Sequence, residues 1–236
     1  MRTLILYSSS ALFLLLTAAF GVVLWKGIDG DCFQIYRFEC IGVLLYIALR
    51  ILFVFLRRNL EFAETFYHEL NHTFFALLCF HKVESFSAHA KKGGLVTFNG
   101  DLNPIIALAP YSFPLFAFWC SLLSLILIPE ARSVARIFVG FFLAFHLICV
   151  LRTTRPYQTD LQLYGFVFSY SAILFSNVFW IPLTARLCAM GISSAMSWCL
   201  SGFEMAKNGI FLAVNGNESD TNSPRSFGQS IFRRSD

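Results

Sequence analysis

The sequence predicts an all-α polytopic membrane protein with about six or seven transmembrane helices and a small hairpin-like loop between the third and the fourth. The chain of 236 residues is 57% hydrophobic and only 14% charged, whereas a soluble domain normally carries about 25% charged residues. Several apolar stretches also reach the roughly 20 residues that a helix needs to cross a bilayer. We therefore expect an integral, multi-pass protein in contact with lipid.

Apolar runs, separated by polar segments, set the expected order of the elements. A single Arg2 precedes the first run, so a signal anchor is the alternative to a first span. Arg50 interrupts the second run, and we expect its long side chain to reach the membrane interface; a buried pair with Glu61 or Glu64 is the alternative. Residues 187–214 are less apolar and would form a seventh span or an interfacial helix. The six expected spans are residues 4–25, 41–56, 61–80, 103–129, 133–151 and 160–183.

The polar segment between the third and fourth spans has the pattern of a β-hairpin. Residues 85–89 and 95–100 each alternate polar and apolar side chains, and Lys91-Lys92-Gly93-Gly94 between them is typical of a turn. A strand at the edge of such a hairpin can pair with an extended peptide. A plain connecting loop is the alternative.

The charge pattern excludes one class of partner. The net charge is only +4, and the basic residues are scattered through the loops, so no nucleic acid is expected to bind. Six alternating spans would place Arg57 and Arg58 on the same side as Arg132. The basic residues on the two sides would then nearly balance, and the positive-inside rule would assign no orientation.

The segment His68-Glu69-Leu70-Asn71-His72 is the strongest chemical signal in the chain. On a helix, His68 and His72 are four residues apart and project from one face. Two imidazoles so placed can hold one Zn²⁺, and Glu69 between them can act as general base on a water at the metal. Because ionisable groups are costly inside a membrane, we interpret the motif as functional rather than as a solvated helix face.

A catalytic zinc typically has three protein ligands and one position open to water. Asp160, at the start of the sixth expected span, is the best-placed carboxylate downstream of the motif, although it would also cap that helix. Asp101, in the polar loop, is its rival. His146 lies inside the fifth expected span. There it would bind metal or transfer protons, or else form a hydrogen bond to a neighbouring helix.

These features together resemble the site-2 protease family of intramembrane zinc metalloproteases. The shared features are the motif on a membrane helix, the hairpin-like loop, a span that contains prolines, and a later Asp at a helix start. The resemblance covers residues 61–183. It implies that His68, His72 and Asp160 bind Zn²⁺ and that Glu69 is the catalytic base.

The match is looser in other places. Asn103-Pro104 and Ala109-Pro110 are similar to the family's segment after the hairpin, which makes Asn103 an accessory candidate beside His146. Leu161 follows Asp160 where the family usually has Gly. Asn71 precedes the second His where the family often has a small residue.

The apolar and polar runs divide the chain into four parts, and the resemblance implies an activity. Residues 1–60 would form two N-terminal transmembrane helices, 61–184 the metalloprotease-like membrane core, 185–214 one or more additional apolar helices, and 215–236 a disordered polar tail. The implied activity is that of a zinc metalloendopeptidase. It would hydrolyse a peptide bond in or near a transmembrane segment of a membrane protein.

Three alternatives remain open at the level of sequence. The chain could be an inactive relative that serves as a membrane scaffold. It could be a membrane metalloprotease of another class, with a Glu as third ligand. It could also be a haem protein in which His146 pairs with a motif histidine. The carboxylates available to the second alternative are Glu84, Glu130, Glu204 and Glu218.

Overall fold

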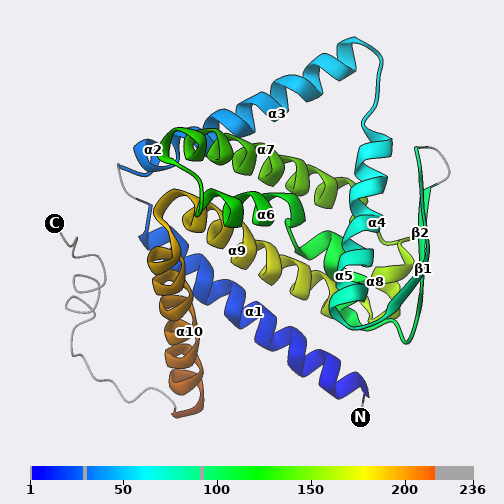
Figure 1. The fold of residues 1–236 in the computed structure, drawn as a ribbon. Helices are drawn as coiled ribbons and strands as arrows, with labels where there is room; N and C mark the ends of the chain where they lie inside the picture. Colours follow the sequence, from blue (N-terminus) through cyan, green and yellow to red (C-terminus); the bar gives the residue numbers. More distant parts are fainter. Residues whose placement is uncertain (1, 29–30, 91–92, 216–236) are drawn as a thin grey trace.

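The computed structural model describes residues 2–28, 31–90 and 93–215. These residues form ten helices and one two-stranded antiparallel sheet (Figure 1). The expected tail lies outside the described residues from position 216 onward, as do Lys91 and Lys92 of the predicted turn. The helices are α1 (Arg2–Lys26), α2 (Cys32–Ile35), α3 (Arg37–Phe55), α4 (Glu61–Leu78), α5 (Pro104–Ser112), α6 (Leu115–Ser124), α7 (Pro129–Thr153), α8 (Thr159–Leu163), α9 (Phe166–Met190) and α10 (Ile192–Asn215). The strands are β1 (Lys82–His89) and β2 (Gly93–Asn99).

The structure bears out a helical membrane protein, but it does not confirm six or seven spans. Within the described residues, the helices long and apolar enough to cross a membrane are four: α1, α3, α7 and α9. Helices α5 and α6 add a fifth if they count as one span, although a bend of 74° separates them. Helix α4 is a single helix as expected, yet with Glu61, Glu64 and Glu69 it is too polar to count among the helices that could cross a membrane.

Helices α3 and α7 pack against each other through two glycines. A Cβ atom on Gly42 would lie 1.9 Å from the backbone oxygen of Ile137, and one on Gly140 would lie 1.9 Å from that of Glu39. Without side chains at these positions the two backbones approach closely, as is common between membrane helices. Arg136 adds a two-pronged ion pair to Glu39, with N···O distances of 2.7 and 2.8 Å.

The contacts between α3 and α7 also show that the two helices run parallel. Glu39, in the first turn of α3, meets Arg136, about two turns into α7, and Tyr46 packs on Phe145 two or more turns further along both helices. The ends of α3 and α7 therefore lie at the same end of the bundle. Arg57 and Arg58, which follow α3, share this end with Arg155 rather than with Arg132, so the side assigned to them by six alternating spans was wrong.

Helices α1, α9 and α10 form the other side of the bundle around one aromatic side chain. Phe20 of α1 is fully buried and contacts Phe175 and Phe179 of α9 as well as Trp198 of α10. A Cβ atom on Gly202 of α10 would lie 2.2 Å from the ring of Phe20. Here too, a glycine opposite a large side chain sets how closely the helices approach.

Helix α4 lies across one end of this bundle with the hairpin along its flank (Figure 1). The predicted hairpin is confirmed: Phe86 of β1 pairs with Val96 of β2 in the antiparallel register, and Phe86 also packs edge-on against Phe66 of α4. Helix α5 then returns beside α4, and α6 continues into the bundle after the bend at Pro114. The motif helix is thus enclosed by the hairpin, by α5 and by the ends of the long helices.

The contact between α3 and α7 generates a stability prediction. Gly140→Ala should push α3 away from α7, because its methyl group would overlap the Glu39 backbone. Overpacking of this kind costs about 1–3 kcal/mol, and each kcal/mol lowers the melting temperature of a chain of this size by about 2–4 °C. Thermal unfolding in detergent measures the effect. Gly21→Ala is the control, since nothing lies within 4 Å of its Cβ position, and an equal melting temperature for both variants would contradict the packing account.

Candidate metal centre

Helix α4 presents the two motif histidines side by side. His68 and His72 lie one turn apart on the same face, as the spacing predicts, and their Nε2 atoms are 3.2 Å apart. Both rings are mostly buried, with side-chain exposures of 15% and 11%. The helix thus directs two nitrogen donors at one point beneath the surface.

Asp160 completes the group from a different part of the chain. It lies in the first turn of α8, and its Oδ2 atom is 3.6 Å from Nε2 of His68 and 3.5 Å from Nε2 of His72. Burial alone would raise the pKa of Asp160, but the two imidazoles beside its carboxylate hold that pKa well below the usual range. We call His68, His72 and Asp160 the ligand cluster.

The chain around Asp160 differs from the single helix expected over 160–183. Helix α8 ends after Leu163, and α9 begins only at Phe166. Gly165 between them has φ +82°, a left-handed conformation that interrupts the helix and that glycine adopts readily. No side-chain cap bond forms at the start of α8, so Asp160 does not serve as the expected helix cap and faces the histidines instead.

The donor set fits a tetrahedral metal ion. Zinc binds imidazole nitrogen and carboxylate oxygen at about 2.0–2.2 Å, which places neighbouring ligand atoms of a tetrahedron about 3.3–3.6 Å apart. The three separations in the ligand cluster are 3.2, 3.5 and 3.6 Å. In the part of the chain that the structure describes, this is the one group of three His, Cys, Asp or Glu residues with such convergence.

A backbone contact fixes the orientation of one imidazole. Nδ1 of His72 lies 2.9 Å from the carbonyl oxygen of Ile106 in α5. A carbonyl only accepts hydrogen bonds, so Nδ1 carries the hydrogen and Nε2 keeps its lone pair toward the cluster. A second contact of this kind on a metal-binding histidine holds the ring in place and raises its basicity.

Glu69 points toward the hairpin, next to the cluster. Glu69 as a residue is 8% exposed, and a Cβ atom on Gly94 of β2 would lie 2.2 Å from its Cγ atom. Only glycine at position 94 therefore allows the hairpin to approach α4 this closely. Among the described residues, the carboxylate of Glu69 has no hydrogen-bond or ion-pair partner, which leaves it free for proton transfer.

A pocket of about 230 Å³ leads from the surface to this carboxylate. One wall is α4 between Glu61 and Glu69, and the opposite wall is the end of the hairpin at Ala90, Gly93 and Gly94. Thr153, at the end of α7, and Gln158, before α8, complete it. His68 and Glu69 both line this space, so water and a polar chain can reach them from outside.

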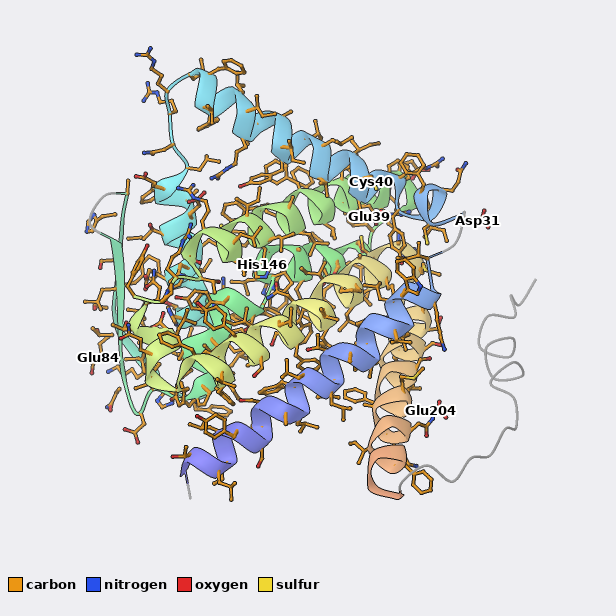
Figure 2. The ribbon with its side chains drawn as sticks, turned by 180° about the vertical axis from the view of Figure 1, so that it is seen from behind. Asp31, Glu39, Cys40, Glu84, His146 and Glu204 are labelled. Carbon is orange, nitrogen blue, oxygen red and sulfur yellow. The ribbon has the colours of Figure 1, made fainter. Side chains whose placement is uncertain are left out.

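Several residues considered from sequence lie elsewhere. Asp101 is exposed, and it is not part of the ligand cluster. Glu84, on β1, faces away from the helices, and Glu204 lies on the outer side of α10 (Figure 2). Glu130 begins α7 at the opposite end of the bundle. Glu218 is outside the described residues.

The two accessory candidates have identifiable contacts that do not include the cluster. Asn103 caps the start of α5: its side-chain oxygen accepts from the backbone nitrogen of Ile106 at 2.9 Å, and its amide nitrogen lies 3.5 Å from Sγ of Cys79. His146 is fully buried, and both of its ring nitrogens contact other side chains. It is therefore not presented to either motif histidine, as pairing through a haem would require.

Sequence reasoning missed two features near the site and chose the wrong alternative for a third. Arg50 does not reach outward as expected; as in the alternative, it donates to the buried carboxylate of Glu64, one turn before His68, and Arg152 donates to the same carboxylate. The hydroxyl of Tyr111 donates to Oδ2 of Asp160 at 3.1 Å. Tyr67 bonds to the bend between α5 and α6. The position of Tyr67 beside the motif and of Tyr111 between Pro110 and Pro114 was the available signal.

Comparison with known proteins adds a family to this geometry. The family model described as Peptidase M50B-like matches residues 40–223, well over half of the chain and including all of the ligand cluster. Neither the curated proteins nor the solved structures gave a match. The chain therefore belongs to the Peptidase M50B-like family, which bears out its resemblance to the site-2 proteases.

Proposed function

We propose that this protein is a multi-pass intramembrane zinc metalloprotease that hydrolyses a peptide bond in or near a transmembrane segment of a membrane protein. The observation that carries the proposal is the convergence of two imidazole nitrogens and one carboxylate oxygen, 3.2–3.6 Å apart, from segments about ninety residues apart in sequence. Membership of a peptidase family supports the same reaction class.

Each residue of the site has a role in this hydrolysis. His68, His72 and Asp160 would hold the zinc ion, which supplies Lewis acidity: it lowers the pKa of water and polarises the scissile carbonyl. Glu69 would accept the proton of the attacking water and deliver it to the nitrogen of the leaving amine. Glu69 has no ion-pair partner among the described residues, which suits a group that must take up and release a proton in each cycle.

The pocket and the hairpin suit a substrate that is locally extended. A peptide bond inside a helix is shielded, so a transmembrane segment must unwind before water can attack it. Strands β1 and β2 pair only with each other among the described residues. Each thus keeps an unpaired edge close to the pocket, where an unwound segment could add main-chain hydrogen bonds.

The ligand assignment predicts the metal content of the purified protein. Wild type in detergent should hold about one zinc per chain by elemental analysis, because three converging donors are typical of a catalytic site. His72→Ala and Asp160→Ala should each lose most of it. His89→Ala, in an exposed histidine of β1, should retain it. Folded wild-type protein that stays metal-free after reconstitution with zinc would sink the protease proposal and favour an inactive scaffold.

The role of Glu69 predicts a variant that binds metal but does not cleave. Glu69→Gln should keep its zinc and lose at least about 10²–10⁴-fold in rate, the usual contribution of general acid–base catalysis. The assay is cleavage, in liposomes, of single-span test proteins with Asn-Pro inside the apolar segment. Glu84→Gln, on the outer side of β1, is the control. A Glu69→Gln variant as fast as wild type would remove Glu69 from the mechanism.

The close contact between Gly94 and Glu69 predicts that the hairpin positions the base. Gly94→Val would force β2 and Glu69 apart, since even its Cβ atom would overlap the Glu69 side chain. A displacement of about 1 Å at a catalytic group can cost about 10²-fold in rate, so we expect that loss with zinc content unchanged. Leu95→Val, at an exposed neighbour on the same strand, should cleave normally. Wild-type cleavage by Gly94→Val would show that the hairpin does not position Glu69.

A further inference from the structure

A network of buried hydrogen bonds joins His146 to the ligand cluster, although His146 itself contacts Tyr67 and Asn177 and none of the three ligands. We propose that His146 is a positioning residue of the metal site: through Tyr67 and Asn177 it holds the motif helix and the end of α5 in register. We call His146, Tyr67, Asn177 and Tyr111 the positioning network. The inference rests on the proposed function in that it concerns metal binding at the same site.

His146 has a polar partner on each side. Its ring is fully buried in the middle of the molecule (Figure 2). Nδ1 lies 3.0 Å from the hydroxyl of Tyr67 in α4, and Nε2 lies 3.1 Å from Oδ1 of Asn177 in α9. One side chain of α7 thus joins α4 to α9 in an apolar interior, where unmade hydrogen bonds are costly.

The hydrogen bonds of Asn177 determine which nitrogen of His146 carries the hydrogen. The amide nitrogen of Asn177 donates to the carbonyl oxygens of Tyr111 and Ile173, both at 2.8 Å. Its other atom, Oδ1, is therefore an acceptor, and Nε2 of His146 must donate to it. Nδ1 of the neutral ring then has a lone pair, so Tyr67 donates its hydroxyl hydrogen to His146. The geometry assigns the Nε2–H tautomer.

The same hydroxyl of Tyr67 contacts the bend between α5 and α6. Pro114 has φ −79° and ψ 68°, the conformation at the centre of an inverse γ-turn. The backbone nitrogen of Leu115, just after it, lies 2.9 Å from the oxygen of Phe113 and 3.1 Å from the hydroxyl of Tyr67. The oxygen of Phe113 is itself 3.1 Å from that hydroxyl. The hydroxyl has one hydrogen, so when Tyr67 donates it to His146 its hydrogen bond to the turn is the one it accepts from the backbone nitrogen of Leu115.

Both arms of the positioning network end beside the ligand cluster. Tyr67 directly precedes His68 in α4, so a shift of its ring pulls on the backbone of the first ligand. Tyr111, whose carbonyl is held by Asn177, donates its hydroxyl to Asp160 and packs edge-on against the His68 ring, with centroids 5.1 Å apart. Hydrogen bonds that start at one buried imidazole on α7 thus position the ligands on both α4 and α8.

Loss of the imidazole should therefore loosen the metal site. His146→Phe keeps a planar ring but leaves the hydroxyl of Tyr67 and Oδ1 of Asn177 without their partner. Substitution of residues that orient metal ligands typically weakens metal binding about 10–100-fold, and we expect zinc affinity to fall within that range. His146→Gln retains one donor and one acceptor, and it should recover part of the affinity.

The experiment uses the full chain in detergent, with zinc and cobalt as probes. Competition with a chelator measures zinc affinity, and the visible spectrum of the cobalt-loaded protein reports the arrangement of the ligands. His146→Phe should weaken zinc and shift the cobalt bands, with partial return in His146→Gln. Leu143→Ala, at a buried residue of α7 outside the positioning network, should alter stability and leave the spectrum unchanged.

The outcomes separate this inference from the proposed function. A wild-type protein that binds neither metal would overturn both. Normal zinc affinity and an unchanged cobalt spectrum in His146→Phe would overturn the positioning role alone, as would equal spectral shifts in Leu143→Ala. In metal-free protein, ¹⁵N NMR of labelled histidine should show His146 protonated at Nε2 and not at Nδ1. The opposite tautomer would contradict the network.

Discussion

The burial of carboxylates inside an apolar bundle is the constraint on which the rest of the structure depends. An unpaired charge there is very costly, and removal of one partner from a buried ion pair typically costs about 3–5 kcal/mol. Glu39 and Glu64 meet this constraint with arginines from other helices. Glu39 joins two helices in this way and Glu64 joins three, so the need to neutralise buried charge also fixes which helices are neighbours.

The ion pairs of Glu39 and Glu64 join α3, α4 and α7, the helices that position the site. Glu39 and Arg136 fix the first halves of α3 and α7, where Gly42 and Gly140 allow close contact. Glu64, with its two arginines, fixes the start of α4 against the ends of the same helices. The motif helix is therefore anchored one turn before its first ligand, which limits how far the imidazoles can move.

The carboxylates of Asp160 and Glu69 are also mostly buried, but neither is neutralised by an arginine among the described residues. Asp160 is surrounded by imidazoles and a tyrosine hydroxyl, an arrangement that a cation at the same point would stabilise. Glu69 is as buried as the structural carboxylates, yet it has no partner within the described residues and faces a pocket instead. Groups in clefts that forgo stabilising partners are candidates for chemistry, and a proton-transfer role accounts for this exception.

The break at Pro114 shows how the fold couples distant segments. A bend inside an apolar run frees backbone groups that need partners in the membrane interior. Here the γ-turn and the hydroxyl of Tyr67 supply them. Since Tyr67 belongs to the motif helix and bonds to His146, satisfying the bend also fixes α4 relative to α7. The bend between α5 and α6 thus helps to hold the motif helix in place, because the backbone nitrogen of Leu115 bonds to Tyr67.

Much of the candidate site could be predicted from the sequence, because its signals are local. The spacing of His68 and His72 places them on one helix face whatever the surroundings. Alternating side chains on either side of two glycines predicted the hairpin, and long apolar runs predicted the membrane class. Asp160 was identified as the best carboxylate downstream, and the structure does bring it to the histidines.

Other features depend on contacts between segments that no local pattern encodes. Hydropathy predicted the helices but not that α3 and α7 run parallel. The sequence also could not decide whether Arg50 reaches the interface or pairs with Glu64, because both features follow from packing at glycines and from the pairing of buried charge. The same holds for His146, whose role depends on which hydroxyl and amide lie beside it. The sequence by itself determined the membrane class and the identity of the donor residues. Only the tertiary structure decided their separations and supports, because these are set by side-chain contacts between helices far apart in the chain.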